Sequence, residues 1–211
     1  MKRRSVWSMV TILVLLLLGF STLTYHVGNG GTNKIDQFVL NLVKSIEFDF
    51  LTTVMKVLSF IGDTIPVITV SIILLFVFYK LYKKTHEIIL FIIVITGSTV
   101  LNQSLKFLLK RGRPIAELVS VDGFSYPSGH TMAAVSLYGI ITYIFWRHIK
   151  IRAVRLRLIV LSTLMIFLIS FSRIYLGVHY PSDVLGAFLV SGAWLCVTIC
   201  SYQYLMDHYK S

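Results

Sequence analysis

The stretch EIILFIIVITGSTVLNQSLKFLLKRGRP, residues 87–114, decides the fold class. Residues 87–109 of it are predominantly apolar, and about 20 such residues in a helix are enough to cross the hydrocarbon core of a membrane. The apolar run then passes directly into a basic loop. The stretch therefore predicts a membrane-spanning helix that ends in a cluster of positive charge.

Similar apolar windows recur along the chain. They lie near residues 6–25, 65–82, 129–146, 156–175 and 184–205. The composition agrees, because 56% of the 211 residues are hydrophobic and only 14% are charged, with a mean hydropathy of +0.80, far from ordinary soluble domains. No repeat or long linker divides the chain. We predict an all-α integral membrane protein, with residues 1–211 forming a single domain built as a six-transmembrane-helix bundle.

Positive charges, Met1-Lys2-Arg3-Arg4, precede the first window, so a cleaved secretory signal is an alternative to a membrane anchor. A signal peptide ends in a small-x-small cleavage site. No such site follows this apolar stretch. We predict a retained anchor helix.

The net charge of +11 raises the question of a nucleic-acid partner. The basic residues flank apolar windows and form no solvated stripe, so we predict no nucleic-acid binding. Their distribution indicates orientation instead, because Lys and Arg are enriched in cytoplasmic loops. With the N-terminus inside, twelve fall on the cytoplasmic side: Lys2, Arg3, Arg4, Lys80, Lys83, Lys84, Arg147, Lys150, Arg152, Arg155, Arg157 and Lys210. We predict a multi-pass protein of the cell membrane with cytoplasmic N- and C-termini.

The other eight basic residues fall on the outer side, and four of them gather around one loop: Lys106, Lys110, Arg111 and Arg113. The same tendency disfavours basic residues there. Because four basic residues gather on the outer side despite this tendency, the cluster indicates a functional role.

An amphipathic segment is predicted over residues 36–61, between the first two windows. Its apolar residues recur at helical spacing: Phe38, Val39, Leu42, Val43 and Ile46. Charged residues interrupt them: Asp36, Lys44, Glu47 and Asp49. Two arrangements stay open for this segment, a helix lying on the outer membrane interface or a helix packed across the mouth of the bundle.

The basic loop supplies the first chemical motif. Lys106 and Arg113 are seven residues apart, so two helical turns would place them on one side. A lysine offers a compact cation and an arginine a bidentate fork, a combination suited to phosphate oxygens. By itself the pair is also explained by basic residues that anchor a helix end in the interface.

The second motif, Tyr126-Pro127-Ser128-Gly129-His130, stands at the start of the fourth window. Ser128 is a candidate N-cap, and Gly129 lets the backbone approach a ligand closely. Free N–H groups and the helix dipole make such a start an anion site, where His130 is placed to act as an acid. An ordinary cap beside an interfacial histidine is the alternative.

The third motif joins the last two windows and runs from Ser172-Arg173 to His179-Tyr180-Pro181-Ser182-Asp183. An aspartate that accepts the Nδ1 proton of His179 would free Nε2 to attack phosphorus, as in catalytic triads. Arg173 would hold the phosphoryl group. Taken separately, Asp183 could also just stabilise the start of the last helix through its dipole.

Together these segments resemble the three signature motifs of the type 2 phosphatidic acid phosphatase family, K-x6-R-P, P-S-G-H and S-R-x5-H-x3-D. Each motif matches in full and in order over residues 106–183, and the six windows extend the resemblance over nearly the whole chain. The resemblance implies a metal-independent lipid phosphate phosphatase without a cofactor.

The same resemblance assigns roles to individual residues. It implies that His179 attacks phosphorus and forms a phosphohistidine, that Asp183 orients it, and that His130 protonates the leaving oxygen. It also implies a phosphate-binding set: Lys106, Arg113, Ser128, Gly129 and Arg173. No residue is assigned to a metal.

The substrate is expected to be a lipid phosphate or diphosphate in the outer leaflet, because the motifs lie opposite the basic cytoplasmic loops. The resemblance favours undecaprenyl diphosphate, keeps phosphatidylglycerophosphate as the alternative, and also allows phosphatidic acid and related lipids. Every motif residue is expected to contact the phosphate that all these lipids carry. Selectivity between lipids is therefore expected in residues 115–124 and in the amphipathic segment. The oligomeric state is not predicted.

A function of another class that the basic cluster allows is a non-enzymatic transporter of phosphate or lipid. A transporter needs cations along a path near the membrane midplane. Here the cations collect at one surface, and a transporter has no use for a histidine oriented by an aspartate. The enzyme is the better interpretation.

Overall fold

The computed structural model describes residues 3–115, 118–119 and 121–208, and the side chains from Trp7 onward. Over these residues the chain forms helices and no strand. The helices are α1 (Arg3–Gly28), α2 (Asn33–Lys44), α3 (Asp49–Ile61), α4 (Thr64–Leu81), α5 (Thr85–Leu109), α6 (Gly129–His148), α7 (Arg152–Tyr175) and α8 (Pro181–His208).

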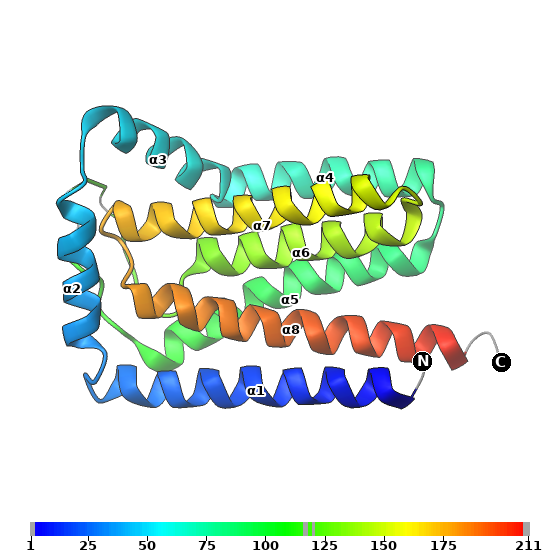
Figure 1. Cartoon of the computed structure of the whole chain (residues 1–211), viewed down its shortest axis with the longest axis horizontal. Coiled ribbons are helices and arrows are strands. Elements are labelled where there is room, and N and C mark those ends of the chain that lie inside the picture. The colour runs from blue at the N-terminus through cyan, green and yellow to red at the C-terminus, as the bar shows by residue number, and fades with distance from the viewer. Residues whose placement is uncertain (1–2, 116–117, 120, 209–211) are drawn as a thin grey trace.

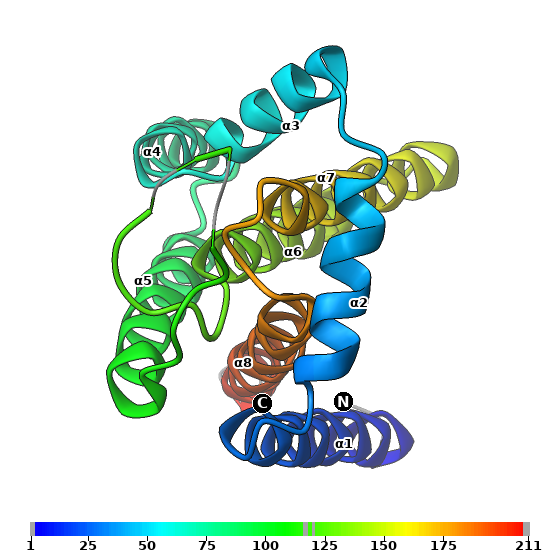
Figure 2. The ribbon, with the colours of Figure 1, turned by 90° about the vertical axis from the view of Figure 1, so that its left-hand side faces the viewer.

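Six of these helices run side by side as a bundle, α1 and α4 to α8 (Figure 1). The short helices α2 and α3 lie across one end of the bundle (Figure 2). The start of α1 and the end of α8 lie at the opposite end, together with the α4–α5 and α6–α7 turns (Figure 1). The two ends of the bundle are therefore different in character, one built from tight turns and one covered by helices.

Five of the described helices are long and apolar enough to cross a membrane, namely α4, α5, α7, α8 and residues Trp7–Gly28 of α1. The predicted all-helical membrane protein is thereby confirmed. Helix α6 is not among the five, because polar side chains interrupt its apolar sequence. Two of them pair with neighbouring helices: Ser136 donates to Ser98 at 2.8 Å and Thr142 to Ser162 at 2.8 Å. The sixth crossing stays a prediction.

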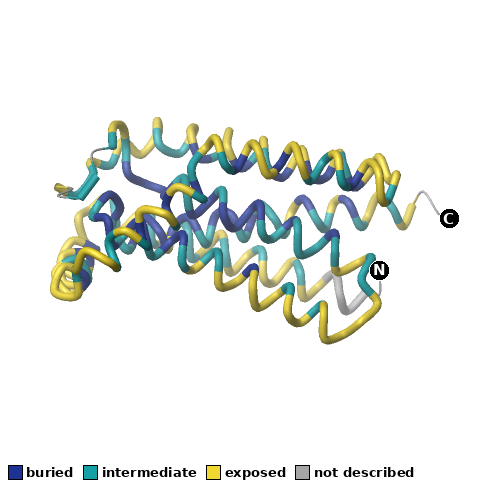
Figure 3. The backbone as a smooth tube through the Cα atoms, turned by 90° about the horizontal axis from the view of Figure 1, so that it is seen from above, coloured by how far each residue is buried: buried dark blue, intermediate teal, exposed yellow. Residues whose placement is uncertain are grey.

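The packed core lies around α6, which contacts α5, α7 and α8. Val94, Ile140 and Ile144 are completely buried there, and Figure 3 shows the buried residues concentrated in the middle of the bundle. Glycine permits close helix approach at Gly97, where an added Cβ would lie 2.1 Å from the Trp194 ring. Such small-residue contacts are typical of helices that pack in membranes.

The amphipathic segment forms two helices, with a break between them at residues 45–48. Helix α2 packs on α7 and α8, and α3 packs on α7 and α4. Of the apolar residues predicted at helical spacing in α2, Val43 is buried, whereas Phe38 is 65% and Leu42 52% exposed. Asp36 is buried instead, because it finds polar partners in the α7–α8 region. Helix α2 thus lies across the bundle end and also carries an exposed apolar stripe.

Candidate active site

The three motif segments meet at the bundle end that carries α2 and α3. Lys106 lies in the last turn of α5, His130 at the start of α6, and Arg173 in the last turn of α7. A cavity of about 370 Å³ is lined by most of the predicted site residues: Lys106, Arg113, Gly129, His130, Arg173 and His179. The other two, Ser128 and Asp183, are fully buried behind it. Residues from three separate segments are therefore brought to one place.

His179 is 1% exposed and is contacted at both ring nitrogens. Its Nδ1 lies 3.3 Å from Asp183 Oδ2, and its Nε2 lies 3.2 Å from Arg113 Nη1. A guanidinium can only donate, so Nε2 is the accepting nitrogen and the proton belongs on Nδ1. Burial lowers the pKa of His179 to about 4, and the hydrogen bond to Asp183 only partly opposes this shift. The imidazole is therefore neutral near pH 7, with its lone pair on Nε2.

Local backbone geometry explains how His179 and Asp183 come together. Gly177 has φ +69°, a left-handed conformation that reverses the chain at the end of α7. Asp183 is the third residue of α8, and its Oδ2 accepts the Tyr180 N–H at 2.9 Å. This bond is one half of a capping box, in which the third helical residue reaches back to the N–H of the cap residue. The cap thus orients the carboxylate that contacts His179.

Arg113 reaches His179 from the basic loop. Its Nη1 also donates to the Val178 carbonyl at 2.9 Å, and its Nε donates to the Gly123 carbonyl at 3.0 Å. The guanidinium is therefore held between the loop and the α7–α8 connection.

Arg173 is 3% exposed, and its Nη1 donates to the hydroxyl of Ser59 at the end of α3. Its Nε is buried and has no hydrogen-bond partner among the described residues. A buried donor without an acceptor is uncommon in proteins. Arg173 therefore keeps one donor for an anion in the cavity that it lines.

The Pro-Ser-Gly-His segment differs in detail from expectation. Ser128 occupies the N-cap position of α6, but its hydroxyl makes no capping bond and accepts from Thr131 Oγ1 at 3.1 Å. An added Cβ at Gly129 would lie 3.1 Å from Asn102 Oδ1. The close approach that glycine allows here is thus to α5, where Asn102 also donates to the Pro127 carbonyl at 3.1 Å.

His130 has a carboxylate partner that the sequence analysis missed. Its Nε2 lies 2.6 Å from Oδ1 of Asp63, which is the N-cap residue of α4. The two residues are 67 positions apart, and no local pattern links them. Arg111 was also given no role, although its Nη1 lies 2.6 Å from Asp183 Oδ1. Only its place inside the basic cluster could have indicated it.

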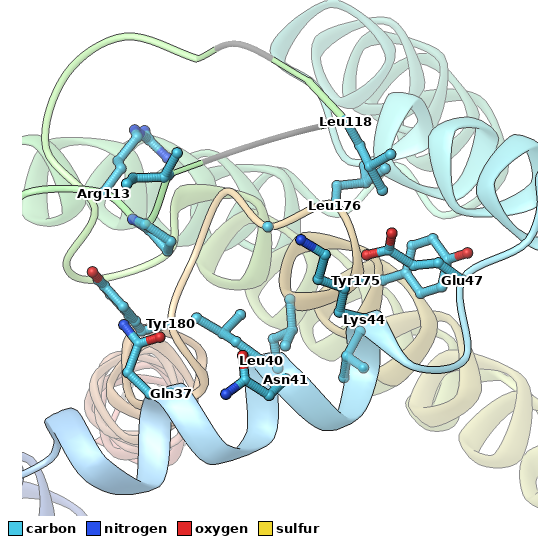
Figure 4. Close-up of a pocket in the computed structure, with 15 residues that line it drawn as sticks. Gln37, Leu40, Asn41, Lys44, Glu47, Arg113, Leu118, Tyr175, Leu176 and Tyr180 are labelled. Carbon is cyan, nitrogen blue, oxygen red and sulfur yellow. The ribbon is translucent and has the colours of Figure 1, made fainter.

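A second cavity, of about 330 Å³, lies on the α2 side of Arg113 (Figure 4). Polar residues of α2 line it, namely Gln37, Asn41 and Lys44, and Tyr180 faces them. The amphipathic segment therefore borders the candidate site. The role of this segment in substrate selection stays a prediction. The same holds for residues 115–124, and residues 116, 117 and 120 of that loop lie outside the described part of the chain.

Among the residues that the structure describes, no three His, Cys, Asp or Glu side chains are grouped so as to hold a metal ion. The expected independence from metals and cofactors stays a prediction that needs a measurement.

Comparison with known proteins identifies the family. The model of the PAP2 superfamily matches residues 87–207. Phosphatidylglycerophosphatase B of Bacillus subtilis (strain 168) is 30% identical over 180 residues, which cover 83% of this chain and 87% of that protein. Undecaprenyl-diphosphatase of Sulfolobus acidocaldarius is 29% identical over 197 residues, covering 86% of each.

A solved structure agrees with these relatives. The crystal structure of a transmembrane PAP2 type phosphatidylglycerolphosphate phosphatase from Bacillus subtilis superposes with a TM-score of 0.85 at 26% identity. The match covers 91% of this chain and 96% of that one. The chain therefore belongs to the PAP2 superfamily of membrane lipid phosphatases.

Proposed function

We propose that the chain removes the terminal phosphate from a lipid in the outer membrane leaflet, by way of a phosphohistidine on His179. One observation carries the mechanism: Nδ1 of His179 faces Asp183 while Nε2 faces Arg113. A neutral imidazole held in this tautomer presents a lone pair at the position where Arg113 would bring a phosphate oxygen. The structure thus supports a nucleophile beside a cation.

The charge around the cavity suits a phosphoryl group. Lys106, Arg113 and Arg173 all line the cavity, and Arg173 Nε still lacks an acceptor among the described residues. Phosphoryl transfer spreads negative charge over the equatorial oxygens, and fixed cations stabilise that charge in the transition state. These three side chains would perform this role together.

In the first step, Nε2 of His179 forms a bond to phosphorus while the bond from phosphorus to the leaving oxygen breaks. The leaving oxygen takes a proton from His130, and the Nδ1 proton of His179 stays hydrogen-bonded to Asp183. Asp63 would accept the Nε2 proton of His130, so the ring must start as the imidazolium. The leaving oxygen takes the Nδ1 proton, and the neutral ring keeps the proton on Nε2.

In the second step, water attacks phosphorus and gives a proton to His130, which acts as the base by microscopic reversibility. The bond from phosphorus to Nε2 breaks. Inorganic phosphate leaves, and both histidines return to their starting protonation states.

The cavity also supports a lipid substrate. Aliphatic side chains line the same cavity as the cations, namely Val67 and Ile68 of α4 and Ile95 of α5. A site that combines cations with aliphatic side chains matches a lipid phosphate. We propose that lipid tails enter between α4 and α5.

For the membrane topology we propose six crossings, with α6 as the sixth, cytoplasmic termini, and the site on the extracytoplasmic face. The clustering of the motifs at the end opposite both termini supports this arrangement (Figure 1). Single cysteines introduced at Lys110 and at Lys150 test it in intact cells, after both native cysteines are replaced. A membrane-impermeant maleimide should label Lys110→Cys only, and labelling of Lys150→Cys alone would reverse the orientation.

The substrate is proposed from the relatives and from the site. The two curated relatives are named for phosphatidylglycerophosphate and for undecaprenyl diphosphate. The contacts described above would all be made to the terminal phosphate, which both lipids carry. We therefore propose that both are hydrolysed. The preference for undecaprenyl diphosphate stays a prediction of the sequence resemblance.

Phosphate release from each lipid, in detergent with excess EDTA, tests the proposal. Wild type should release phosphate, and His179→Ala should lose on the order of 10⁴-fold or more in rate, because no nucleophile remains. His26→Ala is the matched control, since His26 is exposed at the same end of the bundle. Acid-labile phosphate trapped on wild type alone would identify the intermediate.

Three other outcomes of these assays would contradict the proposed mechanism. Activity that disappears with EDTA and returns with a divalent cation would contradict the metal-independent mechanism. Full activity of His179→Ala would exclude the phosphohistidine. Phosphate binding without release from either lipid would support the transporter instead.

A further inference from the structure

A buried carboxylate on the surface helix α2 connects to the candidate site. Asp36 is 1% exposed, although it belongs to a helix whose opposite face is open. Its Oδ1 accepts the Ser182 N–H at 3.0 Å, and its Oδ2 accepts the Ser182 hydroxyl at 2.6 Å. Ser182 is the residue directly before Asp183. Helix α2 is thus fastened to the first turn of α8.

Arg111 links this carboxylate to the predicted catalytic one. Its Nη2 donates to Asp36 Oδ2 at 2.7 Å, and its Nη1 donates to Asp183 Oδ1 at 2.6 Å. The Tyr180 ring lies 4.2 Å from the guanidinium carbon and covers one face of the group. The guanidinium is therefore fixed by hydrogen bonds in its plane and by a ring against that plane.

The two oxygens of Asp183 have different partners as a result. Oδ1 is held by Arg111, whereas Oδ2 receives the Tyr180 N–H at 2.9 Å and faces His179 Nδ1 at 3.3 Å. Rotation about the last side-chain bond of an aspartate is otherwise soft. Arg111 therefore opposes the rotation that would turn Oδ2 away from the imidazole.

We propose that Arg111 is a positioning residue of this active site, and that Asp36 of α2 positions Arg111 in turn. The inference rests on the proposed function of His179 and Asp183. A planar fork is needed at this place, because the same guanidinium must meet two carboxylates in fixed directions. It also supplies the cation that Asp36 and Asp183, both almost fully buried, require between them.

Docking of α2 alone would not need this arrangement. The two hydrogen bonds from Ser182 to Asp36 already attach α2 to α8. Nη1 of Arg111 donates to the Ser182 hydroxyl at 2.7 Å and also to Asp183, which takes no part in attaching α2. A role in the reaction and a role in docking can therefore be separated by variants that remove one contact at a time.

The test compares Arg111→Gln, Arg111→Lys, Asp36→Asn and the double variant Asp36→Asn/Arg111→Gln. Each is assayed for kcat, KM, the rate of phosphohistidine formation in a single turnover, and thermal unfolding in detergent. Arg111→Gln should lower kcat and the phosphorylation rate by about 100-fold, because the imidazole is no longer held in line. KM should change by less than about threefold, since substrate contacts remain.

The other variants distinguish positioning from stability. Arg111→Lys should recover only part of kcat, because one ammonium cannot make both directed contacts. Asp36→Asn should lower kcat by about tenfold, since Arg111 keeps its contact to Asp183. The double variant removes one buried charge of each sign, so its unfolding temperature should rise above that of Arg111→Gln while kcat stays low.

The inference is overturned if Arg111→Gln forms phosphohistidine at the wild-type rate, or if the double variant regains kcat together with its unfolding temperature. Either result would leave Arg111 as a docking residue for α2. Failure of the proposed function looks different, because wild type itself would then form no phosphohistidine with either lipid.

Discussion

Two regions of the molecule supply the candidate site in different ways. Residues 87–207, which match the family, carry all three motifs on α5 to α8. The surface segment formed by α2 and α3, together with the start of α4, carries no motif, yet three of its side chains contact motif residues. Asp36 meets Ser182, Ser59 meets Arg173, and Asp63 meets His130. The motifs supply the reacting groups, and the surface segment holds them in place.

This difference shows where such an enzyme can vary. A reacting group must be of one residue type at one place, whereas a supporting contact can come from any segment that reaches it. We therefore expect the largest losses from changes to the reacting groups, smaller losses from changes to their supports, and almost none from the outward face of the same surface helices.

The pair formed by His130 and Asp63 gives the sharpest contrast between the two regions. His130→Gln should lower kcat on phosphatidylglycerophosphate by about 10²- to 10⁴-fold, because the leaving alkoxide needs a proton. The loss on undecaprenyl diphosphate should be smaller, since a lipid phosphate is a far better leaving group than an alkoxide. Asp63→Asn should lower kcat on both lipids by about tenfold only. Rates of phosphate release from the two lipids test this.

Asp49→Asn is the control for this pair, because Asp49 begins α3 in the same segment and is exposed. It should behave as wild type. Equal losses of His130→Gln on both lipids would contradict the assignment of His130 as the acid. A loss for Asp63→Asn as large as that for His130→Gln would mean that Asp63 takes part in proton transfer directly.

The motif half of the site could be predicted because its signals are local. The pairing of His179 with Asp183 follows from a spacing of four residues at the start of a helix, and the apolar windows indicate where the helices begin. The contacts of Asp36 could not be predicted, because its partner Ser182 lies 146 residues away.

The packing of α2, and not its hydropathy, determines which face of this helix turns toward the bundle. The sequence left open whether the apolar residues of this segment face the membrane interface or the bundle. Phe38 and Leu42 are exposed, because Asp36 and Val43 occupy the inward side of α2. The apolar face of an amphipathic helix can turn toward lipid as well as toward the protein, so its periodicity alone does not identify the inner face. The partner that neutralises a buried carboxylate, here Arg111, selects the face instead.

Ser59 gives a smaller test of support from the surface segment. Ser59→Ala removes the acceptor of Arg173 Nη1 and should lower kcat/KM by about tenfold, as expected for a lost hydrogen bond to a buried charged group. Ser71→Ala is the matched control, because the Ser71 hydroxyl is buried in α4 without a partner among the described residues. Equal effects of both changes would show that Ser59 acts only through packing.

The pH dependence gives a smaller effect with a definite sign. The pKa of His179 is lowered to about 4, mainly by burial, and the positive charge of Arg113 contributes to lowering it. Removing that charge in Arg113→Gln should raise the pKa of His179, so more of the nucleophile is protonated in mild acid. The ratio of kcat/KM of Arg113→Gln to that of wild type should fall about twofold between pH 7 and pH 5.

Using a ratio at each pH cancels the titration of the substrate phosphate, which both proteins share. Lys110→Gln removes a charge from the same loop, and Lys110 is not among the groups that shift the pKa of His179. Its ratio to wild type should stay constant with pH. A ratio for Arg113→Gln that rises toward pH 5 would contradict the predicted sign.

The smallest effect is expected on the outward face of α2. Phe38→Ser exposes a hydroxymethyl group where a ring is already 65% exposed, so the free energy of unfolding in detergent should change by less than about 0.5 kcal/mol. Because Asp36 lies on the other side of the helix, kcat in detergent should also be unchanged. In vesicles KM should rise if the stripe contacts lipid, since apolar contact with the interface is lost. A large loss of kcat in detergent would instead mean that the exposed face of α2 supports the site as strongly as the buried one.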